Sequence, residues 1–325
     1  TIRYLASVGA DFVGLNPIHA LYPAMPDSAS PYSPSSRRWL NINYIDVTAM
    51  PGFNDCSRTQ SLVSAPAFMQ QLAEQRSKDY VDYSGVMQLK LPVMKSLYQW
   101  FAEQKGSNNK ALTTAFKQFK TDGGASLQQL ALYDALHAYL YQQDSMHWGW
   151  PNWPQEYRDP QSDAVQAFAV KHQAELDFYC YLQFIAQQQL AQAQQVAKDA
   201  GMLLGLYRDL AVGVSEASTE IWGNPDLYCR DASVGAPPDP LGPAGQNWGL
   251  PPMQPYQLYK QQYQPFIDLL RANMRDAGAL RIDHVMALLR LWCCPIGSDA
   301  TAGAYIRFPA ADLFAILALE SQRNS

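Results

Sequence analysis

The chain has 325 residues, of which 48% are hydrophobic and 16% are charged, and its formal net charge is −5. This composition is that of an ordinary globular protein with a sizeable core, and it excludes intrinsic disorder. The acidic balance gives no electrostatic footprint for nucleic acid or an anionic membrane surface, so we expect neither partner. No run of about 18 apolar residues occurs, which argues against a transmembrane helix.

The cysteines and the N-terminal residues bear on the cellular compartment. The five cysteines are odd in number and scattered, with no C-x-x-C pair: Cys56, Cys180, Cys229, Cys293 and Cys294. Such a set is typical of a reduced chain. The first residues, TIRYLASVGADFVGL, lack the basic region and cleavage signal of a secretory peptide. The predicted location is the cytoplasm.

In chain order, the first predicted element is a short buried strand over 11–18, DFVGLNPI, which Asn-Pro stops. A loop rich in Pro and Ser follows over 19–41. From about residue 63 to 200, apolar residues recur at helical spacing. The last of these patterns predicts one unbroken helix over 164–200, with Gly201 as its C-cap.

The C-terminal third alternates strands, loops and helices. An apolar run over 202–214, MLLGLYRDLAVGV, predicts a strand. The stretch 215–255 contains so much Pro and Gly that we expect no regular structure in it. A helix over 259–278, a strand over 279–285 (ALRIDHV) and a helix over 311–324 complete the pattern.

This rhythm of strand, excursion, strand, loop, helix and strand is typical of parallel βα units. The predicted fold class is α/β, a (β/α)8 TIM-type barrel that is incomplete here, because only about three barrel strands are visible. We expect a barrel strand with a substrate loop over 1–62, a helical insertion subdomain over 63–200, and barrel strands with a binding loop over 201–325.

The strand ALRIDHV places charges within an apolar run. Alternate side chains of a strand face opposite sides, so Leu280 and Ile282 share one face while Arg281 and Asp283 share the other. At the C-terminal end of a barrel strand, the second face lines the lumen, where catalytic groups lie. The neighbouring guanidinium favours the ionised carboxylate, which makes Asp283 a candidate nucleophile or electrostatic stabiliser. A purely structural ion pair is an equal alternative.

Other polar groups lie where a sugar could contact them. Asp209 interrupts the strand over 202–214 and is placed to hydrogen-bond a sugar hydroxyl or Arg281. Glu216 and Glu220 are weaker candidates, because acidic residues at a helix start are more often caps or solvated. Two loops complete the set, with residues suited to a polyhydroxylated ring: Asp239, Gln246, Asn247 and Trp248 in one, and Ser30, Tyr32, Ser33 and Arg37 in the other.

Several enzyme classes are disfavoured. The sequence has no G-x-S-x-G elbow, Walker loop, G-x-G-x-x-G or H-E-x-x-H motif. The five histidines are spread out, and none has a partner at metal-ligand spacing; His19 and His137 are expected to be core or helix histidines. We therefore expect neither a metal nor a cofactor. The eight Trp and 19 Tyr either stack on sugars or partners, or fill loops.

Together, these motifs resemble the amylomaltases of the bacterial maltose system, the 4-α-glucanotransferases of glycoside hydrolase family 77. The resemblance runs over essentially the whole length and is carried by segments such as SASPYSPSSRRWLN, HWGWPNWP, GAPPDPLGPAGQNWGLPP and GALRIDHVMALLRLW. It implies a (β/α)8 barrel with helical insertions and retaining transfer of α-1,4-glucan chains between maltodextrins.

The resemblance also implies roles for individual residues. Asp283 matches the family's nucleophile, Arg281 the residue that orients it, and His284 a neighbouring sugar contact. Asp209 matches the aspartate of the third-strand motif, and Tyr32 is similar to the tyrosine beside the cleavage point. Asp239, Gln246 and Trp248 match the loop that holds the glucan.

The family's acid/base glutamate lies in a G-E-D-L-like motif that does not occur before Ser325. We therefore expect an internal piece that lacks the N-terminal domain, the first strand and the C-terminal half of the barrel, and that is inactive alone. Two other functions stay open. The chain could belong to an α-glucan hydrolase of the same barrel type, or it could be a non-catalytic glucan-binding fragment.

Overall fold

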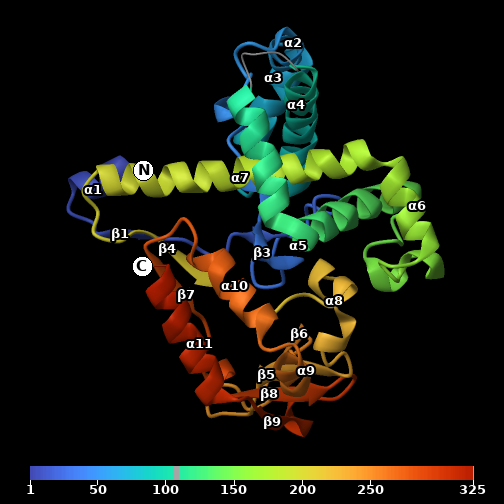
Figure 1. Cartoon of the computed structure of the whole chain (residues 1–325), viewed down its shortest axis with the longest axis vertical. Helices are drawn as coiled ribbons and strands as arrows, with labels where there is room; N and C mark the ends of the chain where they lie inside the picture. The colour runs from blue at the N-terminus through green and yellow to red at the C-terminus, as the bar shows by residue number, and fades with distance from the viewer. Residues whose placement is uncertain (105–109, 325) are drawn as a thin grey trace. The chain divides into compact units, whose positions relative to one another are not determined.

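The computed structural model describes residues 1–104 and 110–324 and divides into two compact units (Figure 1). The sheet unit comprises residues 1–20, 30–40 and 190–325, and it contains every strand of the described residues. The helical unit comprises residues 21–29 and 41–189. The domain limits expected near residues 62 and 200 remain predictions.

The sheet unit is built on a three-stranded parallel sheet in the order β1-β4-β7. These strands are β1 (Phe12–Gly14), β4 (Gly205–Leu210) and β7 (Ala279–Ile282). The prediction of three parallel strands from segments far apart in the sequence is therefore confirmed, but the expected burial of the first strand is wrong, since Phe12 of β1 is 49% exposed. Each strand is shorter than the apolar run that predicted it. Next to this sheet, the short strands β2 (His19–Ala20) and β3 (Ser36–Leu40) pair antiparallel.

The prediction that 215–255 lacks regular structure is wrong. This stretch contains α8 (Thr219–Gly223), β5 (Ala232–Ala236) and β6 (Gln246–Leu250). With β8 (Arg290–Pro295) and β9 (Ala304–Arg307), these two strands form an antiparallel sheet in the order β6-β5-β8-β9. The prolines of this stretch lie outside the two strands: four of them fall in the connection between β5 and β6, and the others precede β5 or follow β6. Gly235 fits β5 because a Cβ there would overlap the carbonyl oxygen of Gln246.

Two predicted helices are broken. The helix expected over 259–278 is divided into α9 (Pro255–Lys260) and α10 (Gln264–Met274). Gln262 and Tyr263 between them have φ values of +52° and +58°, and Pro265 in the first turn of α10 cannot continue a preceding helix. The helix expected over 164–200 is interrupted at His172, whose ring stacks on Phe168 at 4.2 Å.

The helical unit packs aromatic rings in its core. Phe101 of α4 stacks on Tyr181 of α7 with 4.7 Å between ring centroids, and Phe116 of α5 contacts both rings. Many of the chain's aromatic residues are therefore core residues of helices, which differs from the two uses expected from composition, stacking on a ligand or filling loops. The helices are α2 (Ser57–Val63), α3 (Pro66–Arg76), α4 (Tyr83–Glu103), α5 (Lys110–Gln143), α6 (Asp163–Lys171) and α7 (Gln173–Asp199), which continues into the sheet unit.

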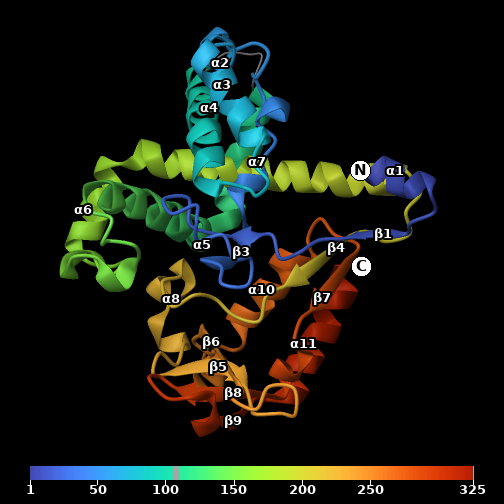
Figure 2. The same cartoon turned by 180° about the vertical axis from the view of Figure 1, so that it is seen from behind.

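Helices α10 and α11 (Ala310–Arg323) support the parallel sheet (Figures 1 and 2). Helix α10 packs against β3, β4 and β7, and α11 packs against α10. Arg271 of α10 clamps the two helices by donating two hydrogen bonds, of 2.7 and 2.9 Å, to Glu320 of α11. Arg323 adds a third bond to Glu320 at 2.8 Å. The sheet unit also contains α1 (Ile2–Ser7).

No helix among the described residues is both long and apolar enough to span a membrane.

The clamp on Glu320 predicts a pH-dependent contribution to stability. Hydrogen bonds from Arg271, and then from Arg323, lower the pKa of Glu320 below its ordinary value near 4.5. The stabilisation is therefore complete above that value and is lost as pH falls through the lowered pKa. We expect Glu320→Gln to reduce the melting temperature near pH 7 and to match the wild type once the pH lies below the lowered pKa of Glu320.

Thermal unfolding across this pH range measures the effect. Glu74→Gln on α3, an exposed glutamate, is the control and should leave the melting temperature unchanged at both the neutral and the acid end of the pH range. A deficit of Glu320→Gln that persists at acid pH would contradict the ionic account of the clamp.

Candidate active site

Asp209, Arg281 and Asp283 lie together where β4 and β7 end. Asp209 of β4 pairs in register with Arg281 of β7. Arg281 donates from Nη1 to Oδ2 of Asp209 at 2.5 Å and from Nη2 to Oδ1 of Asp283 at 2.6 Å. Both are charge-assisted bonds of short length, and the planar guanidinium suits such a bridge. One cation thus fixes two carboxylates from neighbouring strand ends.

The two carboxylates differ in their exposure. The side chain of Asp209 is 7% exposed, whereas that of Asp283 is 32% exposed and that of Arg281 is 44% exposed. Hydrogen bonding to Asp209 raises the pKa of Arg281 above its ordinary value, so this residue stays a cation. Oδ1 of Asp209 is buried and has no hydrogen-bond partner within the described residues. Asp283 is therefore open to a ligand, and Asp209 presents an unused acceptor atom beside it.

His284 directs the chain away from the strand immediately after Asp283. Its backbone has φ +48° and ψ +53°, a left-handed conformation that is uncommon outside glycine and that often occurs at functional sites. Its ring meets Trp248 of β6 edge-on, with 5.2 Å between centroids. Nε1 of Trp248 in turn donates to Oε1 of Gln246 at 2.8 Å. Three predicted sugar contacts therefore form one connected group.

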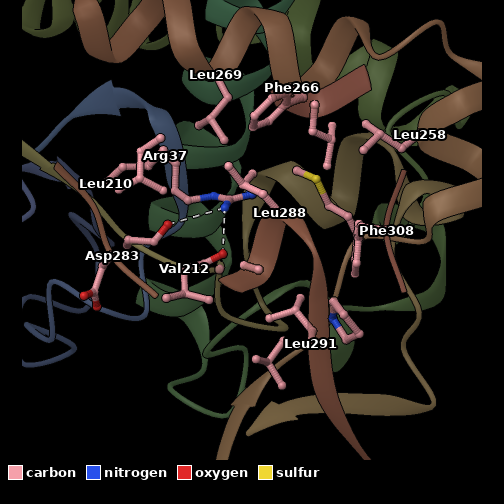
Figure 3. A pocket seen from close by; sticks show the side chains of 18 of the residues that line it. Arg37, Leu210, Val212, Leu258, Phe266, Leu269, Asp283, Leu288, Leu291 and Phe308 are labelled. Carbon is pink, nitrogen blue, oxygen red and sulfur yellow. Dashed lines mark hydrogen bonds between the residues drawn. The ribbon is translucent and has the colours of Figure 1, made fainter. Parts of the chain in front are cut away.

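The opposite face of β4 and β7 carries apolar side chains together with the buried Arg208. Leu210 and Ile282 alternate with the charged residues and line a pocket of about 80 Å³ with aliphatic and aromatic side chains from α10 and α11 (Figure 3). Asp283 lies at its edge, and in Figure 3 its carboxylate points away from the labelled apolar side chains. The predicted division of the strand into an apolar and a charged face is confirmed. The pocket belongs to the apolar layer.

Arg37 is a buried cation in that apolar layer. From β3 it donates through Nη1 to the carbonyl oxygens of Val212 at 2.9 Å and Ala211 at 3.5 Å, in the segment that follows Asp209 (Figure 3). Its charge is compensated by Glu220, whose Oε2 lies 3.6 Å from Nη2. Oε1 of Glu220 also accepts the backbone N–H of Arg37 at 2.5 Å. Arg37 therefore anchors the backbone that continues β4.

Further buried contacts extend this network. The hydroxyl of Tyr228 donates to Oε2 of Glu220 at 2.7 Å. Burial alone would lower the pKa of Arg37, but Glu220 and Tyr228 raise it above its ordinary value. On the other side, Asn273 of α10 donates to the carbonyl oxygen of Arg37 and accepts from Nη2 of Arg208. Burial lowers the pKa of Arg208 to about 10, so it remains charged at neutral pH.

His19 and His137 are buried, as predicted. Nε2 of His19 accepts the backbone N–H of Ala211 at 3.1 Å, so this ring also supports the end of β4. Burial, followed by the nearby Arg208 and Arg37, lowers the pKa of His19 well below its ordinary value. Burial lowers the pKa of His137 to about 4. Both rings are therefore neutral near pH 7.

Three predicted sugar contacts lie outside the connected groups. Tyr32 is 48% exposed, and the carbonyl of Ser30 accepts a backbone bond from Ser33 in the same turn. Oδ1 of Asp239 accepts the backbone N–H groups of Leu241 and Gly242 at 2.8 and 2.6 Å. Asp239 thus stabilises the turn between β5 and β6 with one oxygen. Any contact of these three side chains with sugar remains a prediction.

Sequence reasoning underestimated Glu220 and did not identify Tyr228 or Asn273. Glu220 lies in the first turn of the short helix α8, where an acidic side chain usually favours the helix start. Here it instead binds Arg37, which is 183 positions away in the sequence. The sequence feature that could have indicated this role is the pair of arginines at 37 and 38, because an arginine that becomes buried needs an anionic partner such as Glu220.

Comparison with known proteins gives matches over essentially the whole chain. All residues from 1 to 325 match the family model of the 4-alpha-glucanotransferases, glycoside hydrolase family 77. A 4-alpha-glucanotransferase of Haemophilus influenzae is 42% identical over 99% of this chain and 47% of its own length. One from Mycobacterium tuberculosis is 36% identical over 97% of this chain and 42% of its own length. The chain thus spans about half the length of these curated relatives.

Two solved structures share the fold. An amylomaltase from Corynebacterium glutamicum, 33% identical, superposes with a TM-score of 0.81 over 99% of this chain and 43% of that one. An amylomaltase from Streptococcus agalactiae in complex with acarbose gives 0.77 over 98% of this chain and 61% of that one, at 18% identity.

The Arg37–Glu220 pair predicts a large loss of stability when one partner is removed. Glu220→Gln leaves the buried guanidinium uncompensated, and we expect a cost of about 3 kcal/mol in the free energy of unfolding. Glu103→Gln is the control, because its pairing with Arg58 at 3.6 Å is exposed and is worth at most about 0.5 kcal/mol. Urea denaturation measures both variants. Equally small losses in the free energy of unfolding for the two variants would show that Glu220 is not needed to compensate the buried charge of Arg37.

Proposed function

Because the chain belongs to the 4-alpha-glucanotransferase family, glycoside hydrolase family 77, we propose that it carries the nucleophile of an enzyme that moves α-1,4-glucan chains between maltodextrins. The observation that carries the proposal is the bridge from Arg281 to Asp209 and Asp283 at the ends of two parallel strands. In this proposal, β1, β4 and β7 are neighbouring strands of a (β/α)8 barrel, whose catalytic groups lie at the C-terminal strand ends.

Asp283 is the proposed nucleophile. Arg281 binds its Oδ1, so Oδ2 is the oxygen that attacks the anomeric carbon of the donor glucan. The bond from that carbon to the leaving sugar breaks, a second carboxyl protonates the leaving oxygen, and a glycosyl ester of Asp283 remains. The 4-hydroxyl of an acceptor glucan then attacks the same carbon, gives its proton to the second carboxyl and releases Asp283, with net retention.

The remaining predicted site residues receive supporting roles. The unused Oδ1 of Asp209 accepts a hydrogen bond from a sugar hydroxyl, which satisfies a buried polar atom. Trp248 and His284, held edge to face, offer flat surfaces next to Asp283. Tyr32, Ser30, Asp239 and Gln246 are proposed to contact neighbouring glucose units. Transfer is favoured over hydrolysis when such groups hold the acceptor and exclude water.

No residue of this chain is assigned as the acid/base. Oδ2 of Asp209 is bonded to the guanidinium of Arg281, which also binds Asp283, so Asp209 is assigned a role in positioning and sugar binding. The proposal therefore needs a second carboxyl from elsewhere in the protein. We also propose a cytoplasmic location, which the reduced, scattered cysteines support.

Incubation with maltotriose tests the transferase proposal. The chain extended beyond Ser325 should produce glucose together with glucans longer than maltotriose. Asp283→Asn should reduce this activity more than about a thousandfold, because the nucleophile is lost. Asp226→Asn, an exposed aspartate of the same unit, is the control and should retain activity.

The other outcomes of this experiment separate the alternatives. Shorter sugars without longer ones would indicate a hydrolase. Binding of maltodextrin without turnover would indicate a glucan-binding protein. Transfer by the 325-residue chain unaided would place the acid within it, with Asp209 or Glu216 as the first candidates.

The bridge itself predicts that Arg281 cannot be replaced by lysine. An ammonium group is a point charge that cannot reproduce two parallel bonds to separate carboxylates. We expect Arg281→Lys to lower kcat for maltotriose by about a hundredfold through misplacement of Asp283, with a change in KM of less than about threefold. An unchanged kcat would contradict the orienting role of the guanidinium.

A further inference from the structure

Three tyrosines are presented along α9 and the start of α10, outside the group around Asp283. Tyr256 and Tyr259, one helical turn apart on α9, are each 63% exposed. Between them, Leu258 is 2% exposed and anchors the helix in the core. Tyr263 follows, with its ring 6.1 Å from that of Tyr259 and nearly perpendicular to it. We call Tyr256, Tyr259 and Tyr263 the tyrosine surface.

The rings of the tyrosine surface are held in place. Nζ of Lys260 lies over the ring of Tyr256, 4.7 Å from its centroid. The hydroxyl of Tyr263 donates to Oδ2 of Asp312 on α11. Gln262 and Tyr263 both have a positive φ, a backbone conformation that costs a non-glycine residue free energy and persists only where the surrounding structure holds it. Rings restrained in this way lose little further entropy when a ligand binds.

Neutral amides surround the tyrosines. The segment 256–264 reads YQLYKQQYQ and contains four glutamines. Gln261 exchanges hydrogen bonds with Asn224, from Asn224 Nδ2 to Gln261 Oε1 at 2.9 Å and in the reverse direction at 3.4 Å. An amide supplies both donors and acceptors, as vicinal hydroxyl groups require. Lys260 is the one charged residue within the segment 256–264, so the surface suits a neutral, polyhydroxylated ligand.

We propose that the tyrosine surface binds an α-1,4-glucan chain at a position separate from the Asp283 site. The apolar C–H faces of glucose units stack on Tyr259 and on the ring face of Tyr256 opposite Lys260, while their hydroxyl groups bond to the neighbouring amides. This inference rests on the proposed function, which supplies the ligand class. The surface raises the local concentration of long glucans near the Asp283 site. It does not increase the affinity for a short oligosaccharide, which binds to the Asp283 site alone.

Affinity electrophoresis in gels containing soluble starch tests this proposal with the full-length protein. The wild type should be retarded, and Tyr256→Ala/Tyr259→Ala should weaken starch binding roughly tenfold, since each aromatic contact contributes modestly. Tyr256→Phe/Tyr259→Phe, which keeps the rings, should remain retarded. Tyr80→Ala, at a tyrosine that is 90% exposed in the helical unit, is the matched control and should behave as the wild type.

Kinetics with two substrates separate this proposal from the proposed function. The double alanine variant should raise KM for amylose roughly tenfold and leave kcat/KM for maltotriose unchanged. If the wild type transfers glucan units from maltotriose but the variant keeps full retardation and amylose KM, the tyrosine surface is not a glucan site. Equal losses on maltotriose and amylose would also overturn it. If the wild type neither transfers glucan nor binds starch, the proposed function itself fails.

Discussion

The guanidinium of Arg281 is the interaction on which the rest of the candidate site depends. It binds Asp209 and Asp283 at once, and it can do so because β4 and β7 run parallel with Asp209 opposite Arg281. That register requires close approach of the two backbones just before the strands pair. Gly278 provides it, since a Cβ there would overlap the carbonyl oxygen of Leu204. A shift of β7 by one residue would turn Arg281 and Asp283 to the opposite face, away from Asp209 of β4.

The second constraint is the buried network behind the sheet. Arg37, compensated by Glu220, binds the carbonyl oxygens that follow β4, and His19 accepts the N–H of Ala211 in the same segment. Asn273 connects Arg37 to Arg208 and to helix α10. Because each of these groups is buried, an unpaired partner costs several kcal/mol, so the network holds the end of β4 in one arrangement. This buried hydrogen-bond network therefore fixes the position of the charged face from within the apolar layer behind it.

Local pattern was sufficient for part of this structure. The alternation in ALRIDHV predicted the two faces of β7, and the apolar runs around residues 13, 207 and 281 predicted three parallel strands. The alternation of apolar and charged residues is a local pattern, so the few residues of one strand are enough to predict its two faces. Trp248 was singled out for its residue type and His284 through the family resemblance; the contact between their rings was not predicted.

Long-range contacts account for what the sequence did not predict. Strand β5 pairs with β6 and β8 although the stretch is rich in Pro and Gly, because its prolines lie outside the strands and Gly235 permits a close approach. Glu220 looks like an ordinary helix-start residue until β3 brings Arg37 to it. Propensity scales depend only on residues that are close along the chain. The pairing of β5 and the bonding of Glu220 depend on residues that are distant in sequence and close in space.

The central claim is that Asp283 becomes covalently bonded to the sugar, and trapping the ester tests it most directly. A fluorinated α-glucosyl fluoride slows the second half of a retaining reaction, so the ester accumulates and intact-protein mass spectrometry can detect it. The full-length protein should gain the mass of one glycosyl group, located by peptide mapping on Asp283 and absent from Asp283→Asn. A glycosyl group on another carboxylate, or its persistence in Asp283→Asn, would contradict the assignment of the nucleophile.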